Sequence, residues 1–217
     1  MGDQEEPLIR KIEHKKPTRL SEPRIPPLDK AKTRKLVEEL LDKSEWDGLV
    51  QKVIEDTKEV KTFISSLNVW ATLLRYKDLS FSLYVDNGHI MSRSSLPDRD
   101  REILILRIAW LCYAEYEWAQ HVRFGKFVGL IDEEINRILE GPDAEGWDSF
   151  NSALIRSVDE LYKDTFISDA TWKSLTECYD TNQLMDLVFT VGQYQSLAMA
   201  LNTLGVQLEE GIEGFPK

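Results

Sequence analysis

The sequence has 217 residues, of which 42% are hydrophobic, so the chain can bury one substantial core. Its formal net charge of -11 and pI near 4.9 argue against nucleic acid or a membrane surface as a partner, because both carry negative charge. Its two cysteines, Cys112 and Cys178, are too few for a disulfide framework and are typical of a reducing compartment. We therefore expect a cytoplasmic protein.

The N-terminal segment 1–28 mixes charges with prolines, which favours extended backbone over helix. We predict an extended or disordered arm here, with apolar anchors in 24–28 that could dock on a neighbouring subunit. Acidic residues near the start argue against a signal peptide. No apolar run reaches the ~18 to 20 residues of a membrane span. Residues 29–217 are predicted to form a single all-helical domain.

The first predicted helices are marked by apolar periodicity. Asp29 can cap a helix whose apolar residues recur at helical spacing up to residue 41. Further helices are expected over 46–59 and 69–90. The clearest helix start in the chain combines the Ser95 hydroxyl, Pro97 and two acids in the first turn.

The helix that begins after Ser95 should lie in the middle of the molecule. Between Glu102 and Tyr113 every residue except Arg107 is apolar or aromatic. A guanidinium in such a helix requires a buried partner, and Glu102, Glu115 or Glu117 are the candidates that the sequence offers.

Four more helices complete the chain. A short one near 131–139 is closed by Gly141 and Pro142, and another is expected over 147–162. Ser168 precedes a shorter helix that ends near residue 179. Asp180 or Thr181 then opens a last long helix that runs from 183 to about 204. No strand is indicated, so the predicted fold class is all-α.

A cluster of polar residues in 96–130 carries the chemistry. Glu102 is followed by the run Glu115-Tyr116-Glu117-Trp118 and then by His121. This pattern resembles the carboxymuconolactone decarboxylase and alkylhydroperoxidase D family, in which a glutamate precedes a Cys-x-x-Cys pair and a histidine follows the second cysteine by four residues. The acid and the histidine match in type and spacing.

Both thiol positions of that motif, residues 114 and 117, lack sulfur in this chain, so redox cycling through a cysteine pair is excluded. Cys112 has no partner three residues further on, and its apolar neighbours should resist its ionisation. The cysteine-free pattern looks like the decarboxylase branch of the family. Weaker likeness in 23–28, 158–161 and 192–194 extends the resemblance over roughly residues 23–208.

The resemblance implies an alkylhydroperoxidase D-like helical bundle with a break near 112–115, although no Gly or Pro marks one and periodicity alone predicts a single long helix. Glu102 lies about ten residues before the break, and His121 lies about seven residues after it. At about 1.5 Å per residue, the two side chains would then lie at similar distances from the turn along the two antiparallel helices. They could then share a pocket, in which His121 acts as a general acid or base, Glu102 orients it and Arg107 stabilises an anionic intermediate.

Each of these residues also has a structural explanation. His121 could be a satisfied core histidine, Glu102 a complement to the helix dipole, and Arg107 half of a buried ion pair. The candidate substrate-binding residues also have structural explanations, since they could pack in the core, form the wall of a pocket or lie at a subunit contact. These candidates are Tyr116, Glu117, Trp118, Gln193 and Tyr194.

The leading hypothesis is a lyase that acts by acid–base chemistry on a small cyclic or aromatic-derived carboxylic acid or lactone. A peroxidase-type antioxidant is disfavoured by the missing thiols, and a non-catalytic binding or scaffold protein is the other alternative. We expect no metal site, because ligand spacing is absent, and no cofactor. The resemblance also implies a homo-oligomer, whether a dimer, a trimer or a hexamer.

Overall fold

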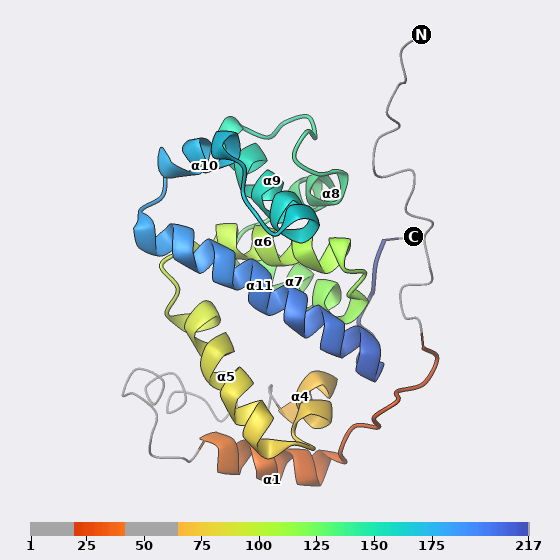
Figure 1. The fold of residues 1–217 in the computed structure, drawn as a ribbon. Coiled ribbons are helices and arrows are strands. Elements are labelled where there is room, and N and C mark those ends of the chain that lie inside the picture. Colours follow the sequence, from red (N-terminus) through yellow and green to blue (C-terminus); the bar gives the residue numbers. More distant parts are fainter. Residues whose placement is uncertain (1–19, 42–64, 217) are drawn as a thin grey trace.

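The computed structural model describes residues 20–41 and 65–216, and within these ranges every regular element is a helix (Figure 1). The all-α prediction is confirmed. The predicted helix over 46–59 lies outside the described residues. In chain order the helices are α1 (Lys30–Leu41), α4 (Asn68–Leu73), α5 (Lys77–Ser92), α6 (Asp98–Leu111), α7 (Glu115–Phe127), α8 (Asp132–Glu140), α9 (Ser149–Asp164), α10 (Asp169–Thr176) and α11 (Thr181–Leu204).

Helix α6 is the centre of the bundle, as its apolar sequence predicted. It packs against α7, α8, α9 and α11, and its residues Ile103–Ala109 are all buried. Helix α11 crosses α6 and also contacts α5, α7 and α9, while α10 packs on α9 (Figure 1). A helix that is apolar all round requires such cover on every side, and these four helices supply it.

The predicted break between two antiparallel rods is confirmed. Helix α6 ends at Leu111, and α7 starts at Glu115. Between them Tyr113 has φ of 53°, a left-handed conformation that is uncommon for a residue other than glycine. The Ala114 N–H donates to the Ala109 carbonyl, which tightens the turn. The chain therefore reverses without the Gly or Pro that usually signals a turn.

The prediction of one helix over 69–90 is wrong. The chain forms α4 and α5, separated at Tyr76, which has extended backbone with φ of −122° and ψ of 91°. Leu73 and Leu74 are buried, and Leu74 packs beside α1 with Trp70 and Val37, whereas Leu79 on α5 is exposed. The apolar periodicity thus came from two short helices with different partners.

Helix α6 starts where it was predicted, but its expected cap is wrong. The helix begins at Asp98 with Pro97 as the N-cap residue and no side-chain cap. The Ser95 hydroxyl instead donates to the Asp186 carboxylate on α11, at 2.7 Å. The tertiary fold brings an acceptor on another helix within reach of this hydroxyl. The hydroxyl therefore donates to Asp186 and does not accept from the N–H groups of its own helix.

Several other helix ends carry the caps that the sequence indicated. The Asp29, Ser168 and Asp180 side chains accept from the first turns of α1, α10 and α11, respectively. Gly141, with φ of 110°, closes α8. Helix α9 starts two residues later than predicted, at Ser149, because Asp148 caps it.

The described part of the N-terminal arm, residues 20–28, is extended and lies along the chain's own helices. The Arg24 N–H donates to the Leu204 carbonyl at the end of α11, and the Leu28 N–H donates to the Ala71 carbonyl of α4. Across the described residues, no helix combines the length and apolar character needed to cross a membrane.

Candidate functional site

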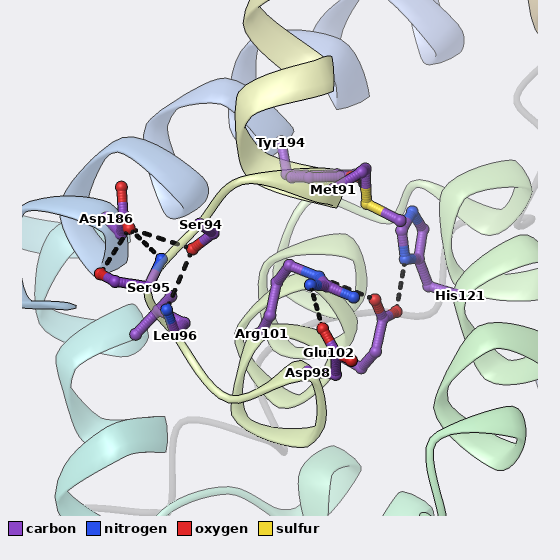
Figure 2. Close-up of polar contacts among 10 residues, drawn as sticks. All are labelled: Met91, Ser94, Ser95, Leu96, Asp98, Arg101, Glu102, His121, Asp186 and Tyr194. Carbon is purple, nitrogen blue, oxygen red and sulfur yellow. Dashed lines mark hydrogen bonds and ion pairs between the residues drawn. The ribbon is translucent and has the colours of Figure 1, made fainter. Parts of the chain in front are cut away.

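The structure brings Glu102 and His121 together across the α6–α7 pair. His121 Nδ1 lies 2.7 Å from Glu102 Oε2, and the exposed fractions are 6% for His121 and 0% for Glu102 (Figure 2). The nineteen-residue separation in sequence closes into direct contact because the rods are antiparallel. A carboxylate that accepts from one ring nitrogen fixes the imidazole and directs the other nitrogen, Nε2, away from it.

Arg101, which the sequence analysis missed, is the cation beside this pair. Its Nε donates to Glu102 Oε1 at 3.3 Å, and its Nη1 donates to Asp98 Oδ1 at 2.6 Å (Figure 2). The Arg101 side chain is only 7% exposed. Asp98 and Arg101 are three residues apart in one helix, a spacing that brings opposite charges together and could have pointed to this residue.

Arg107 does not pair with any of its predicted partners, Glu102, Glu115 and Glu117, so that prediction is wrong. Its guanidinium binds both carboxylate oxygens of Asp159 on α9, at 2.6 and 2.8 Å. It also donates to the Ile138 and Leu139 carbonyls in the last turn of α8. The C-terminal end of a helix is the negative end of its dipole, and its last carbonyls have no partner within the helix. The end of α8 therefore supplies carbonyl acceptors for Arg107, which a search for acidic side chains in the sequence could not find.

Glu117 is buried without a partner one turn before His121. It is 2% exposed, and neither carboxyl oxygen makes a hydrogen bond. Burial therefore raises the pKa of Glu117 well above its usual value. Since positions 117 and 121 are four apart on α7, the two side chains share a helix face. The site thus combines a carboxylate-bound imidazole with a carboxyl group held in its neutral form.

Tyr194 from α11 forms a wall of the site. Its ring meets the His121 ring edge to face, with centroids 4.9 Å apart, and its hydroxyl donates to Met91 Sδ at 3.1 Å. Burial, with a smaller contribution from the charge of Glu102, raises the pKa of Tyr194 well above its usual value. The hydroxyl therefore stays protonated.

Three other candidate residues lie in different surroundings. The Tyr116 hydroxyl donates to Glu209 Oε1 at 2.6 Å in the C-terminal segment. The Trp118 ring packs with Trp110 and Phe215 in the core. Gln193 lines a separate cleft between α5 and α11. Among the predicted residues, Glu102, His121 and Tyr194 meet directly, and Glu117 joins them through its helix.

The thiol and metal predictions concern the same region. Burial raises the pKa of Cys112 to about 12, so this thiol stays protonated near neutral pH. In the described ranges, 20–41 and 65–216, no three potential metal ligands cluster.

Comparison with known proteins places this motif in a family. Residues 83–156 match the model of the carboxymuconolactone decarboxylase family. The segment contains α6, α7 and α8, and hence Glu102, Glu117 and His121. The resemblance inferred from the sequence is therefore confirmed. No curated protein matches the chain significantly in sequence.

Solved structures share the fold around this carboxymuconolactone decarboxylase family segment. A peroxidase-related protein from Silicibacter sp. TM1040 has a TM-score of 0.64 at 13% identity, over 91% of this chain and 95% of that one. An alkylhydroperoxidase AhpD core protein from Ralstonia eutropha JMP134 has 0.62 at 14% identity, over 76% and 87%. A protein of unknown function from Agrobacterium tumefaciens, with a suggested AhpD antioxidant role, has 0.58 at 15% identity, over 62% and 93%. At these identities the likeness establishes the fold alone.

Proposed function

We propose that this protein is an acid–base enzyme of the carboxymuconolactone decarboxylase type, acting on a small cyclic or aromatic-derived carboxylic acid or lactone. The observation that carries the proposal is the buried 2.7 Å contact between His121 Nδ1 and Glu102 Oε2. Burial of an imidazole against a carboxylate is the arrangement that general acid–base catalysis uses. Family membership of residues 83–156 adds weight to it.

In the proposed reaction the C–C bond to the substrate carboxylate breaks and carbon dioxide leaves. The electron pair of that bond passes into an enolate, and His121 then delivers a proton from Nε2 to the carbon. Water restores the proton to His121 afterwards. Glu102 holds the ring through Nδ1 and stabilises the imidazolium while it exists.

Glu117 and Arg101 complete the proposed machinery. A neutral carboxyl group can donate a hydrogen bond to an enolate oxygen, and it does so more strongly in a buried site than in water. Glu117 has that protonation state and no competing partner. Arg101 replaces Arg107 as the cation and acts through Glu102, so we assign it a positioning role.

The test is a substrate panel of carboxylated lactones and β-keto acids, read by carbon dioxide release and by the matching loss of mass. His121→Gln should lower kcat by roughly 100-fold or more, the range that general acid–base groups contribute. Glu102→Gln and Glu117→Gln should each lower kcat as well. Glu133→Gln, which changes an exposed acid on α8 in the same way, is the control and should leave turnover unchanged.

Two results would overturn the proposal. Turnover of a substrate by the His121→Gln variant at the wild-type rate would remove the imidazole from the mechanism. Consumption of an organic hydroperoxide at a rate unaffected by alkylation of both cysteines would point to a different chemistry. Tight binding of panel compounds without any turnover would favour the scaffold alternative instead.

A further inference from the structure

A second cleft, away from His121, opens between α5 and α11 with a volume of about 660 Å³. This volume is within the range of about 300 to 1,000 Å³ that small-molecule sites occupy. Its apolar lining includes Ile90, Met185 and Phe189, and Phe189 is 66% exposed. Arg93, Asn182 and Gln193 line it with polar groups. The cleft therefore pairs an apolar wall with a small number of hydrogen-bonding side chains.

The acid in the cleft is already satisfied. Asp186 accepts from the Ser95 N–H at 2.6 Å, from the Ser95 hydroxyl at 2.7 Å and from the Ser94 hydroxyl at 3.2 Å (Figure 2). It also accepts from His89 Nε2 at 2.7 Å. Burial would raise the pKa of Asp186, but the hydrogen bonds from His89 and Ser95 outweigh it and lower the pKa to about 2. Asp186 is thus ionised and already accepts four hydrogen bonds, three of them at Oδ2, and none of them comes from Arg93.

Arg93 is the unmatched charge of the cleft. Its Nε is buried and makes no hydrogen bond, and the guanidinium forms no ion pair with any of the residues that the structure describes. A guanidinium presents donors in a planar fork that fits a carboxylate or a phosphate. Arg24, Arg75 and Arg123 also lack an ion pair, but among the arginines that the structure describes only Arg93 has a buried nitrogen that makes no hydrogen bond. The missing partner is then expected to come from outside the chain.

We propose that this cleft binds a small organic carboxylate with an apolar body, whose charged group pairs with Arg93 and whose carbon skeleton packs on Phe189 and Met185. The apolar wall distinguishes such a ligand from inorganic phosphate, which would leave these side chains in water. The amides of Asn182 and Gln193 lie in the same cleft and can satisfy the remaining carboxylate lone pairs.

The cleft and the His121 site are separate. Met91 and Tyr194, joined by the bond from the Tyr194 hydroxyl to Met91 Sδ, lie between Asp186 and His121 in Figure 2. Gln193 lines the cleft, whereas the neighbouring Tyr194 ring faces His121. The inference therefore does not depend on the proposed decarboxylation and can be tested by binding alone.

The experiment is calorimetric titration of the full chain with octanoate, with octanamide as the neutral isostere and with inorganic phosphate. Wild-type protein should bind octanoate at least tenfold more tightly than octanamide, because a charge-assisted bond is worth more than a neutral one. Phosphate should bind more weakly than octanoate. Arg93→Gln should weaken octanoate at least tenfold and leave octanamide unchanged, while Phe189→Ala should weaken both.

Two controls locate the ligand. Arg156→Gln changes a surface arginine that already pairs with Asp143, so octanoate affinity should stay the same. His121→Gln should also leave it unchanged, whatever happens to turnover. Loss of octanoate binding in His121→Gln, equal affinity of wild-type protein for octanoate and octanamide, or tighter binding of phosphate would each overturn the proposal. The isostere comparison needs no variant, so it decides the question even if Arg93→Gln fails to fold.

Discussion

Replacing Glu117 by glutamine should change how the stability of the protein depends on pH. Glu117 is 2% exposed and neither carboxyl oxygen has a hydrogen-bond partner, so its ionised form is strongly disfavoured in the folded state. The unfolded chain exposes the same carboxyl group to water, where it ionises at its ordinary pKa of about 4.3. Glutamine keeps the shape and volume of the side chain but cannot ionise.

The sign and size of the effect follow from proton linkage. Because the folded pKa of Glu117 is the higher of the two, the folded state binds more protons at any pH between the two values. The contribution of Glu117 to stability is therefore full below the unfolded pKa, and it is lost as the pH rises toward the folded one. Over that interval the wild-type protein should lose about 1.4 kcal/mol per pH unit relative to the variant.

The assay is urea unfolding of the wild-type protein and Glu117→Gln at a series of pH values from 5 upward. The difference between the two unfolding free energies cancels the other titrating groups, which both proteins share. Glu133→Gln, which removes an exposed carboxyl group, is the matched control, and its difference from wild type should vary much less. A constant difference between wild type and Glu117→Gln across this range would show that Glu117 ionises in the folded state, and it would refute the argument for a neutral acid in the site.

Two further predictions concern the groups around the site. Asp159→Ala should destabilise the fold by roughly 3 kcal/mol in urea unfolding, because it leaves the buried Arg107 guanidinium without its acidic partner. The control, Asp143→Ala, breaks an exposed ion pair and should cost less than about 1 kcal/mol. Similar costs for the two variants would contradict the assignment of Arg107 to a buried pair. Near pH 8, a thiol reagent should modify the exposed Cys178 of the native protein much faster than Cys112, because burial raises the pKa of Cys112 to about 12. Peptide mass mapping measures the two rates. Equal rates would show that the Cys112 thiol is accessible and ionised.

The second thiol position of the family motif is occupied here by Glu117. A thiol and a carboxyl group of similar reach can occupy the same place on α7, but they differ in chemistry, because the neutral acid donates a proton and has no redox couple. The first thiol position is Ala114, which is fully buried at the turn between α6 and α7. Under the proposed function, the groups around His121 would work by acid–base chemistry rather than by a redox cycle.

The sequence by itself determined that the chain is helical and which helix lies at its centre. The apolar run of α6 has no polar face, so it can only be stable when other helices cover it on all sides. Caps such as Asp180 and the terminating Gly141 act within a few residues of their own helices, which makes them visible without a tertiary structure. The match of Glu102 and His121 to a family motif also needed only spacing.

Only the tertiary structure decided which charged groups meet. Arg107 is bound by Asp159, which lies fifty-two residues away, and by carbonyls at the end of α8, and neither kind of partner has a local signature. The same applies to Ser95, whose hydroxyl serves Asp186 rather than its own helix. Burial of Glu117 without a partner depends on what α11 and the turn before α7 place around it. Long-range contacts of this kind depend on how the helices pack, whereas the sequence pattern records only which face of each helix is apolar.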